Sequence, residues 1–430
     1  MGITINGSSA AGNIDLGTNG TITDLAVGGL PDGTVDGDSV STIPASKLTG
    51  ALPAISGASL TGISSPLSFR NLLYNGQMSV CQRNTSLTSI TGSNDGVVVH
   101  DRWKYTLTDA GTWSVEQVED APAGFAYSAK IKCTTAATFG ASGRVYLEQL
   151  IEGQDQQRYK YGTGSAESLT LSFWIKSSRT GTFNAGLTNQ GARSGSPSGT
   201  EIADRATSQL VTISSANTWE KKTVTFAGDT GAYIRNTTTK GVGLRLAFNA
   251  GSTYTGGAAQ SWGSATNANT YTGTLGLGTA TNDDLFITGV QLEVGTTATS
   301  FEYKSYTDEF LNCARYCWVV ENGSAGSTAF PSGVTFGRHP DTARWIPTFP
   351  VQMRSAPSVT GTGVFKIYDT TATNTFTIGT SGTCTGENIS RWSSIISFSN
   401  GVGDDLSYGN AGQLYGDGTN AAKVVFNAEL

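Results

Sequence analysis

Acid–base chemistry in this 430-residue chain would have to come from three groups of carboxylates: Asp283-Asp284, Asp404-Asp405 and the set of Glu148, Glu152 and Asp155. Cleavage of a glycosidic bond needs two carboxylates about 5 to 10 Å apart. Neighbouring residues in a strand point to opposite faces, so neither Asp pair is a ready acid–base couple. Asp404-Asp405 fits a solvated turn better. We therefore expect no catalytic residue, although sequence spacing leaves the third group open.

Other catalytic and metal-binding patterns are absent from the sequence. The two histidines, His100 and His339, lie near no Ser or Cys pattern that would make a triad. There is no H-E-x-x-H, no G-x-S-x-G, no G-x-x-x-x-G-K-[ST] and no G-x-G-x-x-G between a strand and a helix. The cysteines are odd in number and form no C-x-x-C pair, which favours free thiols: Cys81, Cys133, Cys313, Cys317 and Cys384.

Aromatic rings in polar surroundings are the candidates for glycan binding. A ring face covers the apolar side of a sugar, while Asn, Gln, Asp or Arg bind its hydroxyls. The loop from Asn249 to Asn282 carries Tyr254, Trp262 and Tyr271 without apolar neighbours, so we expect these rings to have little core to enter. Nearer the end of the chain, Gly- and Ser-rich stretches hold Trp345, Trp392, Tyr408 and Tyr415. Packing is the alternative for each of these rings, and we assign Trp103, Trp174, Trp219 and Trp318 to packing.

Composition favours an all-β protein of two or three domains. The chain has 55 Gly and only 14% charged residues, so it is poor in helix formers and rich in turn formers. A net charge of -6 without a Lys/Arg run argues against nucleic acid or an anionic membrane as the partner. We expect no signal peptide and no membrane insertion, because no stretch of about 18 apolar residues occurs.

Residues 282 to 320 join two of the expected domains. Alternation of apolar residues from Phe286 to Val294 predicts a half-buried strand. After it, Ser305 and Asp308 offer a capping box, and a three- and four-residue spacing from Phe310 to Trp318 predicts an amphipathic helix over 305–323. If the chain forms a trimer, Phe310, Leu311 and Trp318 would contact the same helix of neighbouring copies.

Residues 1–66 cannot form a globular core by themselves, because their apolar residues are sparse and single. From Ile43 they repeat, since Ile43, Leu48, Thr49 and Gly50 recur twelve residues later as Ile55, Leu60, Thr61 and Gly62. Such a thin segment can bury its apolar residues only against copies of itself or another protein. We predict an extended shaft in an intertwined oligomer; a disordered linker is the alternative.

The rest of the chain is predicted to form two β domains. Short runs that alternate cleanly, such as Leu169 to Ile175 and Val242 to Phe248, predict a β-sandwich over 67–304. Similar runs separated by Gly and Asn predict a further β domain over 324–430.

Several ordered motifs resemble bacteriophage tail-fibre and receptor-binding proteins. The L-T-G and I-P-A-S-K-L repeats resemble fibre shaft and attachment regions. The motifs F-R-N-L-L-Y-N-G-Q-M (69 to 78), D-R-W (101 to 103), S-F-W-I-K-S (172 to 177), N-T-W-E-K-K-T-V-T-F (217 to 226) and V-Q-L-E-V-G-T-T-A-T-S-F-E-Y-K-S-Y (290 to 306) resemble a jelly roll of such proteins, similar in fold to carbohydrate-binding modules. F-P-V-Q-M-R-S-A-P-S-V-T (349 to 360) and F-N-A-E-L (426 to 430) resemble the unit that accompanies it.

The resemblance implies a homotrimeric, non-catalytic tail fibre, assembled in the host cytoplasm and located in the virion. Residues 1–66 would attach to a baseplate or tail protein, and the β domains would bind host cell-surface polysaccharide. It also implies a structural calcium at Asp284, with Asp101 or Asp95 as a second ligand, because calcium prefers oxygen donors; the alternative is a plain Asn-Asp-Asp turn. Two other functions stay open, a tailspike depolymerase and a structural virion protein without a ligand.

Overall fold

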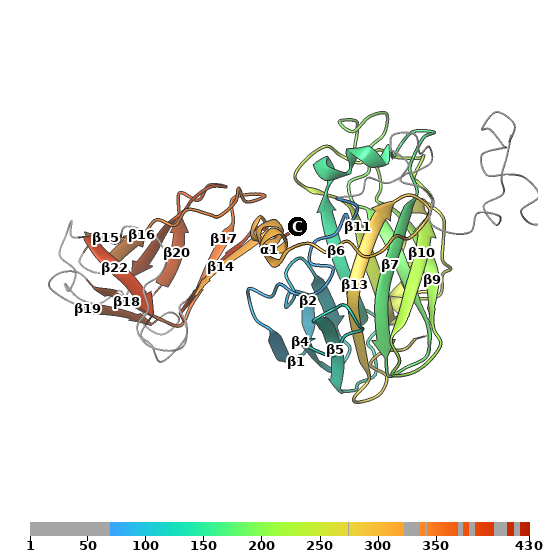
Figure 1. The fold of residues 1–430 in the computed structure, drawn as a ribbon, viewed down its shortest axis with the longest axis horizontal. Coiled ribbons are helices and arrows are strands. Elements are labelled where there is room, and N and C mark those ends of the chain that lie inside the picture. The colour runs from blue at the N-terminus through green and yellow to red at the C-terminus, as the bar shows by residue number, and fades with distance from the viewer. Residues whose placement is uncertain are drawn as a thin grey trace, which may run out of the picture. The chain divides into compact units, whose positions relative to one another are not determined.

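Two antiparallel sheets, built from strands between Ser86 and Val294, form a sandwich in the computed structural model of the protein (Figure 1). The structure describes residues 69–273, 275–321, 335–339, 342–368, 373–377, 383–399, 411–416 and 422–430. The predicted shaft, 1–66, lies outside the described residues. In the described part the chain is nearly all β, as its composition predicts.

The first sheet of the sandwich has six strands. In spatial order these are β1 (Ser86–Ile90), β4 (Thr112–Val118), β5 (Ser128–Thr135), β13 (Asp284–Val294), β7 (Leu169–Ser177) and β10 (Glu220–Phe226). The predicted strand from Phe286 to Val294 is therefore central to this sheet. It is buried on both faces, not half-buried as predicted. Segments outside the sheet contact it, since Leu72 N donates to Leu292 O at 2.8 Å and Thr299 N donates to Glu293 Oε1 at 2.8 Å.

The second sheet has seven strands and carries the candidate site. In spatial order these are β12 (Gly263–Ser264), β9 (Arg205–Ile213), β8 (Gly181–Asn189), β11 (Lys240–Ala250), β6 (Arg144–Glu152), β3 (Lys104–Thr108) and β2 (Ser93–Val97). Alternation along β11 sends Leu244 and Leu246 into the core with Leu171 and Ile287 of the first sheet. Arg245 and Ala247 then lie on the opposite face, away from that core.

Short helices stand at the edges of the sandwich. These are the 3₁₀ turns η4 (Gly153–Tyr159), η5 (Ser252–Tyr254) and η6 (Asn267–Asn269), and α1 (Tyr306–Ala314), which is the one α-helix in the described part of the chain. The predicted cap of α1 is confirmed, since Asp308 N donates to Ser305 Oγ at 3.1 Å. None of the helices described is long and apolar enough to cross a membrane.

The predicted helix over 305–323 is wrong in its second half. The chain leaves α1 after Ala314 and enters strand β14 (Cys317–Glu321), so Trp318 lies on a strand. The run Trp318-Val319-Val320 is rich in strand-forming residues, and pairing with β23 (Lys423–Asn427) supplies its backbone partners. This long-range pairing overrides the helical spacing read from the sequence.

Within its described residues, the last β domain contains two sheets. A three-stranded sheet has the order β14, β23 and β17 (Ser358–Thr362). A seven-stranded sheet has the order β19 (Thr373–Thr377), β18 (Val364–Tyr368), β22 (Ala411–Gly416), β15 (Thr335–His339), β16 (Thr342–Trp345), β21 (Ile395–Ser399) and β20 (Thr383–Glu387). Buried Trp345, Phe398, Val424 and Phe426 contribute to the core of this domain.

Residues 428 to 430 dock against the sandwich. Ala428 N donates to Tyr316 O at 2.7 Å, and the buried Glu429 carboxylate forms an ion pair with Arg102. Arg354 Nη2 donates to Glu429 O at 3.0 Å. All five cysteines are free thiols, as predicted, and Cys313 and Cys317 are buried.

Candidate functional site

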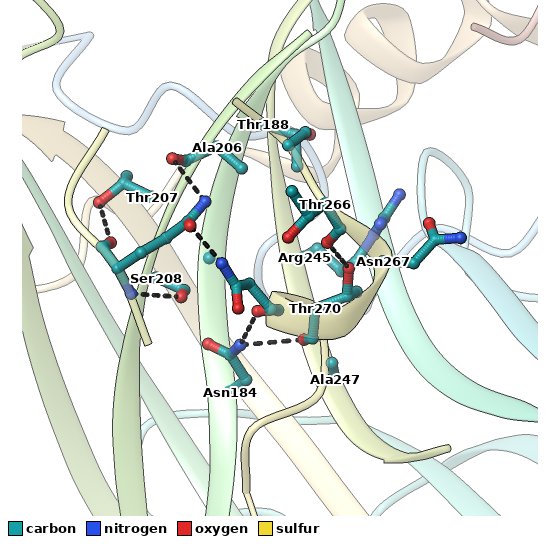
Figure 2. A pocket seen from close by; sticks show the side chains of 14 residues that line it. Asn184, Thr188, Ala206, Thr207, Ser208, Arg245, Ala247, Thr266, Asn267 and Thr270 are labelled. Atoms are coloured by element: carbon teal, nitrogen blue, oxygen red, sulfur yellow. Dashed lines mark hydrogen bonds between the residues drawn. The ribbon is translucent and has the colours of Figure 1, made fainter. Parts of the chain in front are cut away.

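A pocket of about 130 Å³ lies on the outer face of the seven-stranded sheet (Figure 2). Its floor comes from three neighbouring strands, with alternate residues of β8 and β11 and three consecutive residues of β9. Its wall comes from the loop that follows β11. The lining residues are Asn184, Gly186, Thr188, Ala206, Thr207, Ser208, Arg245, Ala247, Gln260, Ala265, Thr266, Asn267, Asn269 and Thr270.

Hydrogen bonds to the strands hold this loop in place. Asn184 Nδ2 donates to Thr270 O at 2.9 Å and to Asn269 O at 3.2 Å, as the dashed lines in Figure 2 show. Gln260 N donates to Ser208 Oγ at 3.2 Å, and Asn269 Nδ2 donates to Gln260 Oε1 at 2.5 Å. Because its backbone carbonyls and amides are bonded to strand residues, the loop forms a preformed wall.

Asn184 provides a free acceptor in the pocket. Its side chain is 2% exposed, and both described bonds use Nδ2. Oδ1 is buried and has no partner among the described residues. A buried acceptor without a partner costs about 1–3 kcal/mol, so a ligand that donates a hydrogen bond here would recover that energy.

Arg245 is the charged residue in the pocket lining. Its Nε and Nη2 donate to Glu148 Oε2 at 3.0 and 2.5 Å, and its guanidinium lies 4.5 Å from the centre of the Tyr146 ring. Burial alone lowers the pKa of Arg245, but the neighbouring Glu148 carboxylate outweighs this and raises the pKa. Arg245 therefore stays charged at all ordinary pH values.

The three predicted aromatic residues of the loop lie behind the pocket and outside its lining. Tyr271 is buried, with its ring centre 6.2 Å from Tyr146 and 6.0 Å from Tyr254. Trp262 packs edge-on against Tyr161, and its Nε1 donates to Ala227 O at 2.7 Å. The expectation that these rings have little core to enter is wrong for Tyr271, because folding of the loop buries it. Tyr254 and Trp262 are half-buried, and glycan binding by these two rings stays a prediction.

The predicted aromatic residues of the last domain have different environments. Trp345 is 1% exposed and packs in the domain core, so it cannot contact a glycan and that prediction is wrong. Trp392 is 59% exposed, in a turn that Ser390 Oγ holds by accepting bonds from Trp392 N and Ser393 N. Trp392 thus remains available to a ligand, whereas Tyr408 lies outside the described residues.

Of the predicted calcium ligands, Asp101 is bonded elsewhere in the described structure. Asp101 is buried and accepts bonds from Gln82 N and Gln82 Nε2 at 3.2 and 2.5 Å. The Asp101 backbone O accepts a bond from Asn75, and the next residue, Gly76, accepts a bond from Val290 of β13. Val290 is six residues along the strand from Asp284, which at about 3.3 Å per residue is a separation of roughly 20 Å. No three His, Cys, Asp or Glu side chains in the described part gather to hold a metal.

Calcium at Asp284 stays a prediction, in which backbone carbonyls would have to replace Asp101. Asp284 is half-buried at the start of β13, where its backbone O accepts a bond from Ser178 N at 3.0 Å. The side chain of Asp95, in β2, lies outside what the structure describes. Melting temperatures with and without a chelator would decide the question.

The residues predicted to pack in a trimer are only partly free. Trp318 lies on β14 and not on the predicted helix, and it stacks on Phe426 with 5.2 Å between ring centres. It is half-buried, so its contact with a neighbouring chain stays a prediction. On α1, Phe310 stacks on Tyr306 at 6.3 Å and is half-buried, while Leu311 is 36% exposed. Leu311 and part of Phe310 therefore remain open to a neighbouring chain.

The candidate catalytic carboxylates in the described part are engaged with cations or peripheral to the pocket. Glu148 pairs with Arg245, and Glu152 receives bonds of 2.7 Å from Arg315 Nε, Arg315 Nη2 and Tyr316 Oη. Asp283 accepts from Arg179 Nη1 at 3.0 Å. Since the lining residues include no carboxylate, this pocket has the donors and acceptors of a binding site without an acid–base pair.

Sequence reasoning found the loop of the site but missed Asn184, Arg245 and Gln260. A signal was present, because Asn184 lies between Phe183 and Ala185, and Arg245 between Leu244 and Leu246. Polar residues that alternate with core residues mark the outward face of a sheet. Their convergence depends on the pairing of Arg245 with Gly186 and of Ala247 with Asn184 across β11 and β8.

A larger cleft of about 640 Å³ includes the exposed rings of Phe69 and Tyr303. Its lining also holds the carboxylates Asp155, Glu302 and Asp308. We take the pocket on the sheet as the candidate for binding, because polar residues of three neighbouring strands and the following loop converge there without a carboxylate.

Comparisons with known proteins give distant structural likenesses. No family model and no curated protein matches the chain. The enzymatically active domain of tailspike protein 4 from bacteriophage CBA120 is 14% identical over 52% of this chain and 21% of that chain, with a TM-score of 0.27. A family 11 carbohydrate-binding module from Clostridium thermocellum, solved with a β-1,3-1,4-mixed-linked tetrasaccharide, is 11% identical over 50% of this chain and 100% of that one, with a TM-score of 0.24.

A third likeness is to a xylan-binding domain from Paenibacillus barcinonensis, 11% identical over 50% of this chain and 94% of that one, with a TM-score of 0.21. This chain spans about a fifth of the tailspike domain's length. Identities and TM-scores this low carry no argument about function, which has to come from the site itself.

Proposed function

We propose that this protein binds a cell-surface glycan in the pocket between the seven-stranded sheet and residues 260 to 270. The observation that carries the proposal is the buried Asn184 Oδ1, which lacks a partner in a pocket lined by amides and hydroxyls. A sugar hydroxyl can donate to this atom and accept from neighbouring N–H groups at the same time. A volume of about 130 Å³ is below the roughly 300–1,000 Å³ of drug-sized ligand sites, so the pocket suits one saccharide unit.

The setting we propose is a bacteriophage tail fibre. Support comes from the twelve-residue repeat in 1–66 and from the ordered fibre-like motifs between Phe69 and Tyr306. The protein would be a homotrimer in the virion, with its N-terminal segment on a baseplate or tail protein and its β domains toward the host. Three weak sites on one particle would gain avidity through effective concentration. Light scattering should give three chains per particle, and a monomer would contradict the trimer.

We propose binding without catalysis. The pocket lining holds no carboxylate, and Glu148 and Glu152 are bonded to arginines. A depolymerase would release reducing ends from the polysaccharide that it binds. Measuring reducing ends during prolonged incubation distinguishes the two functions.

Trp392 is a second candidate contact, on the last domain. Its ring is 59% exposed, and Ile346, 38% exposed, lies two residues before Thr348, which bridges to Ser393. A fixed, exposed indole can stack on a sugar face. Loss of binding in Trp392→Ala but not in pocket variants would move the site to this domain.

The experiment is retention of the full chain on a panel of bacterial surface polysaccharides. Ala265 is exposed on the pocket rim, so Ala265→Trp should block the pocket without disturbing the core and reduce binding at least tenfold. The matched control is Ala216→Trp, an equally exposed alanine in the turn between β9 and β10, which should bind normally. Normal binding by Ala265→Trp would refute the pocket, and failure to bind any polysaccharide would refute glycan binding.

A further inference from the structure

Arg245 uses only one side of its guanidinium for its described ion pair. A guanidinium carries five N–H donors in a planar fork. Nε and Nη2 both donate to one oxygen, Oε2 of Glu148, and Nη1 has no partner among the described residues. The Nη1–Nη2 edge is therefore free to donate two parallel hydrogen bonds, which is the arrangement that binds a carboxylate most strongly.

This edge is held in one orientation. Glu148 fixes the Nε side, and the Tyr146 ring lies 4.5 Å from the guanidinium carbon. The Arg245 side chain is 22% exposed, so part of it remains open on the pocket side. A prepositioned fork loses little conformational entropy when a ligand binds.

No carboxylate side chain lines the pocket. Apart from Arg245, its lining consists of Asn, Gln, Ser, Thr, Gly and Ala residues. The carboxylate that pairs with Arg245, Glu148, lies on the Nε side of the guanidinium. A ligand carboxylate would therefore meet one cation and neutral hydrogen-bonding groups.

The register of β8 and β11 puts Arg245 and Asn184 on the same face of the sheet. Arg245 pairs with Gly186, and Asn184 is two residues along β8, so the backbones of Arg245 and Asn184 are diagonal neighbours roughly 7–8 Å apart. Gly186 lies between them and adds no side chain to the floor of the pocket. A pyranose with a carboxylate at one end and hydroxyls at the other can reach both groups.

We propose that the pocket binds a uronic acid unit, with its carboxylate on the free edge of Arg245 and a hydroxyl donating to Asn184 Oδ1. The inference rests on the proposed glycan-binding function and narrows its ligand to an acidic saccharide.

The test compares matched sugars against the full chain by titration calorimetry. The probes are D-glucuronate and D-galacturonate, their neutral methyl esters, and D-glucose and D-galactose. Each uronate should bind at least tenfold more tightly than its ester and its neutral parent sugar. The preference should fall as salt is raised, because an exposed charge pair is screened.

Two variants separate the charge from the fold. Glu148→Gln keeps a hydrogen-bond acceptor for Arg245 and removes the negative charge beside it, so the ratio of uronate affinity to neutral-sugar affinity should rise several-fold. The double variant Glu148→Gln with Arg245→Gln replaces the ion pair by a neutral amide pair and should abolish the preference for uronates. Thermal melting checks that both variants fold.

The outcomes distinguish the two proposals. Equal or tighter binding of the neutral sugars, or a lower ratio of uronate affinity to neutral-sugar affinity in folded Glu148→Gln, overturns the acidic ligand and leaves glycan binding intact. If no sugar binds but acidic polysaccharides are retained in an Arg245-dependent way, the inference stands for longer chains. If neither acidic nor neutral sugars or polysaccharides bind, both proposals fail.

Discussion

Asp101 and Glu429 are buried carboxylates with opposite pKa shifts, although both lie 3.6 Å from Arg83. Burial raises the pKa of Asp101 to about 7, and Arg83 and Gln82 only partly oppose this. Burial also acts on Glu429, but Arg102 and Arg83 together outweigh it and lower the pKa of Glu429. The difference follows from the number and closeness of the cations, since Glu429 has a direct ion pair with Arg102.

The raised pKa of Asp101 predicts a stability that falls as pH rises from about 4 to 7. Between these pH values the folded state keeps a proton on Asp101 that the unfolded chain has lost. Raising the pH therefore lowers the free energy of unfolding, by up to about 1.4 kcal/mol per pH unit. Asp101→Asn should remove this contribution. Urea unfolding of both proteins between pH 4 and 8 measures it, and parallel pH profiles would contradict the prediction.

Local elements differ in how far their own residues determine them. The start of α1 is set locally, by the cap between Ser305 and Asp308. The loop after β11 is set by distant partners, since it is bonded to Asn184 and Ser208 on β8 and β9. The candidate site therefore depends on a loop whose position is a tertiary property.

Removing the cap of α1 should weaken the helix by a predictable amount. Ser305→Ala leaves Asp308 N without its side-chain acceptor and should cost about 1 kcal/mol in unfolding free energy. Thr307→Ala, at an exposed position of the first turn, is the control and should cost less than about 0.5 kcal/mol. Equal effects in urea unfolding would show that the cap contributes nothing.

At the scale of the whole molecule, a buried polar contact joins the last domain to the sandwich. Gln82 Nε2 donates to Cys317 O at 2.6 Å, Val319 N donates to Gln82 Oε1 at 3.2 Å, and Arg354 Nη1 donates to Thr238 O at 3.3 Å. At the centre of this contact, the side chains of Arg102 and Glu429 are only 2% and 7% exposed. A buried charge without its counter-ion is unfavourable, so removing either Arg102 or Glu429 should destabilise the folded protein.

Glu429→Ala should therefore destabilise the protein strongly. It leaves the buried Arg102 without its carboxylate, which typically costs about 3–5 kcal/mol. Glu321→Ala provides the control, because the Glu321 side chain is 53% exposed and its pair with Lys423 at 3.3 Å should contribute under about 1 kcal/mol. Denaturant unfolding followed by tryptophan fluorescence reports both, and similar midpoints would refute the buried ion pair.

Local chemistry in the sequence was enough for the β class, the strand from Phe286 to Val294, the cap at Ser305 and the free thiols. Strand periodicity, turn residues and capping need only neighbours a few residues away. The same local reasoning failed at Trp318 and Trp345. There, pairing of β14 with β23 and packing against Phe426 decided the outcome.

Only the tertiary structure decided the candidate site. The sequence pointed to the loop from Asn249 to Asn282, but it could not show that the rings of Tyr271 and Trp262 turn inward. Nor could it show that Asn184 and Arg245, 61 positions apart, are diagonal neighbours on the paired strands β8 and β11. Strand register between distant segments places these groups, and no local preference encodes register.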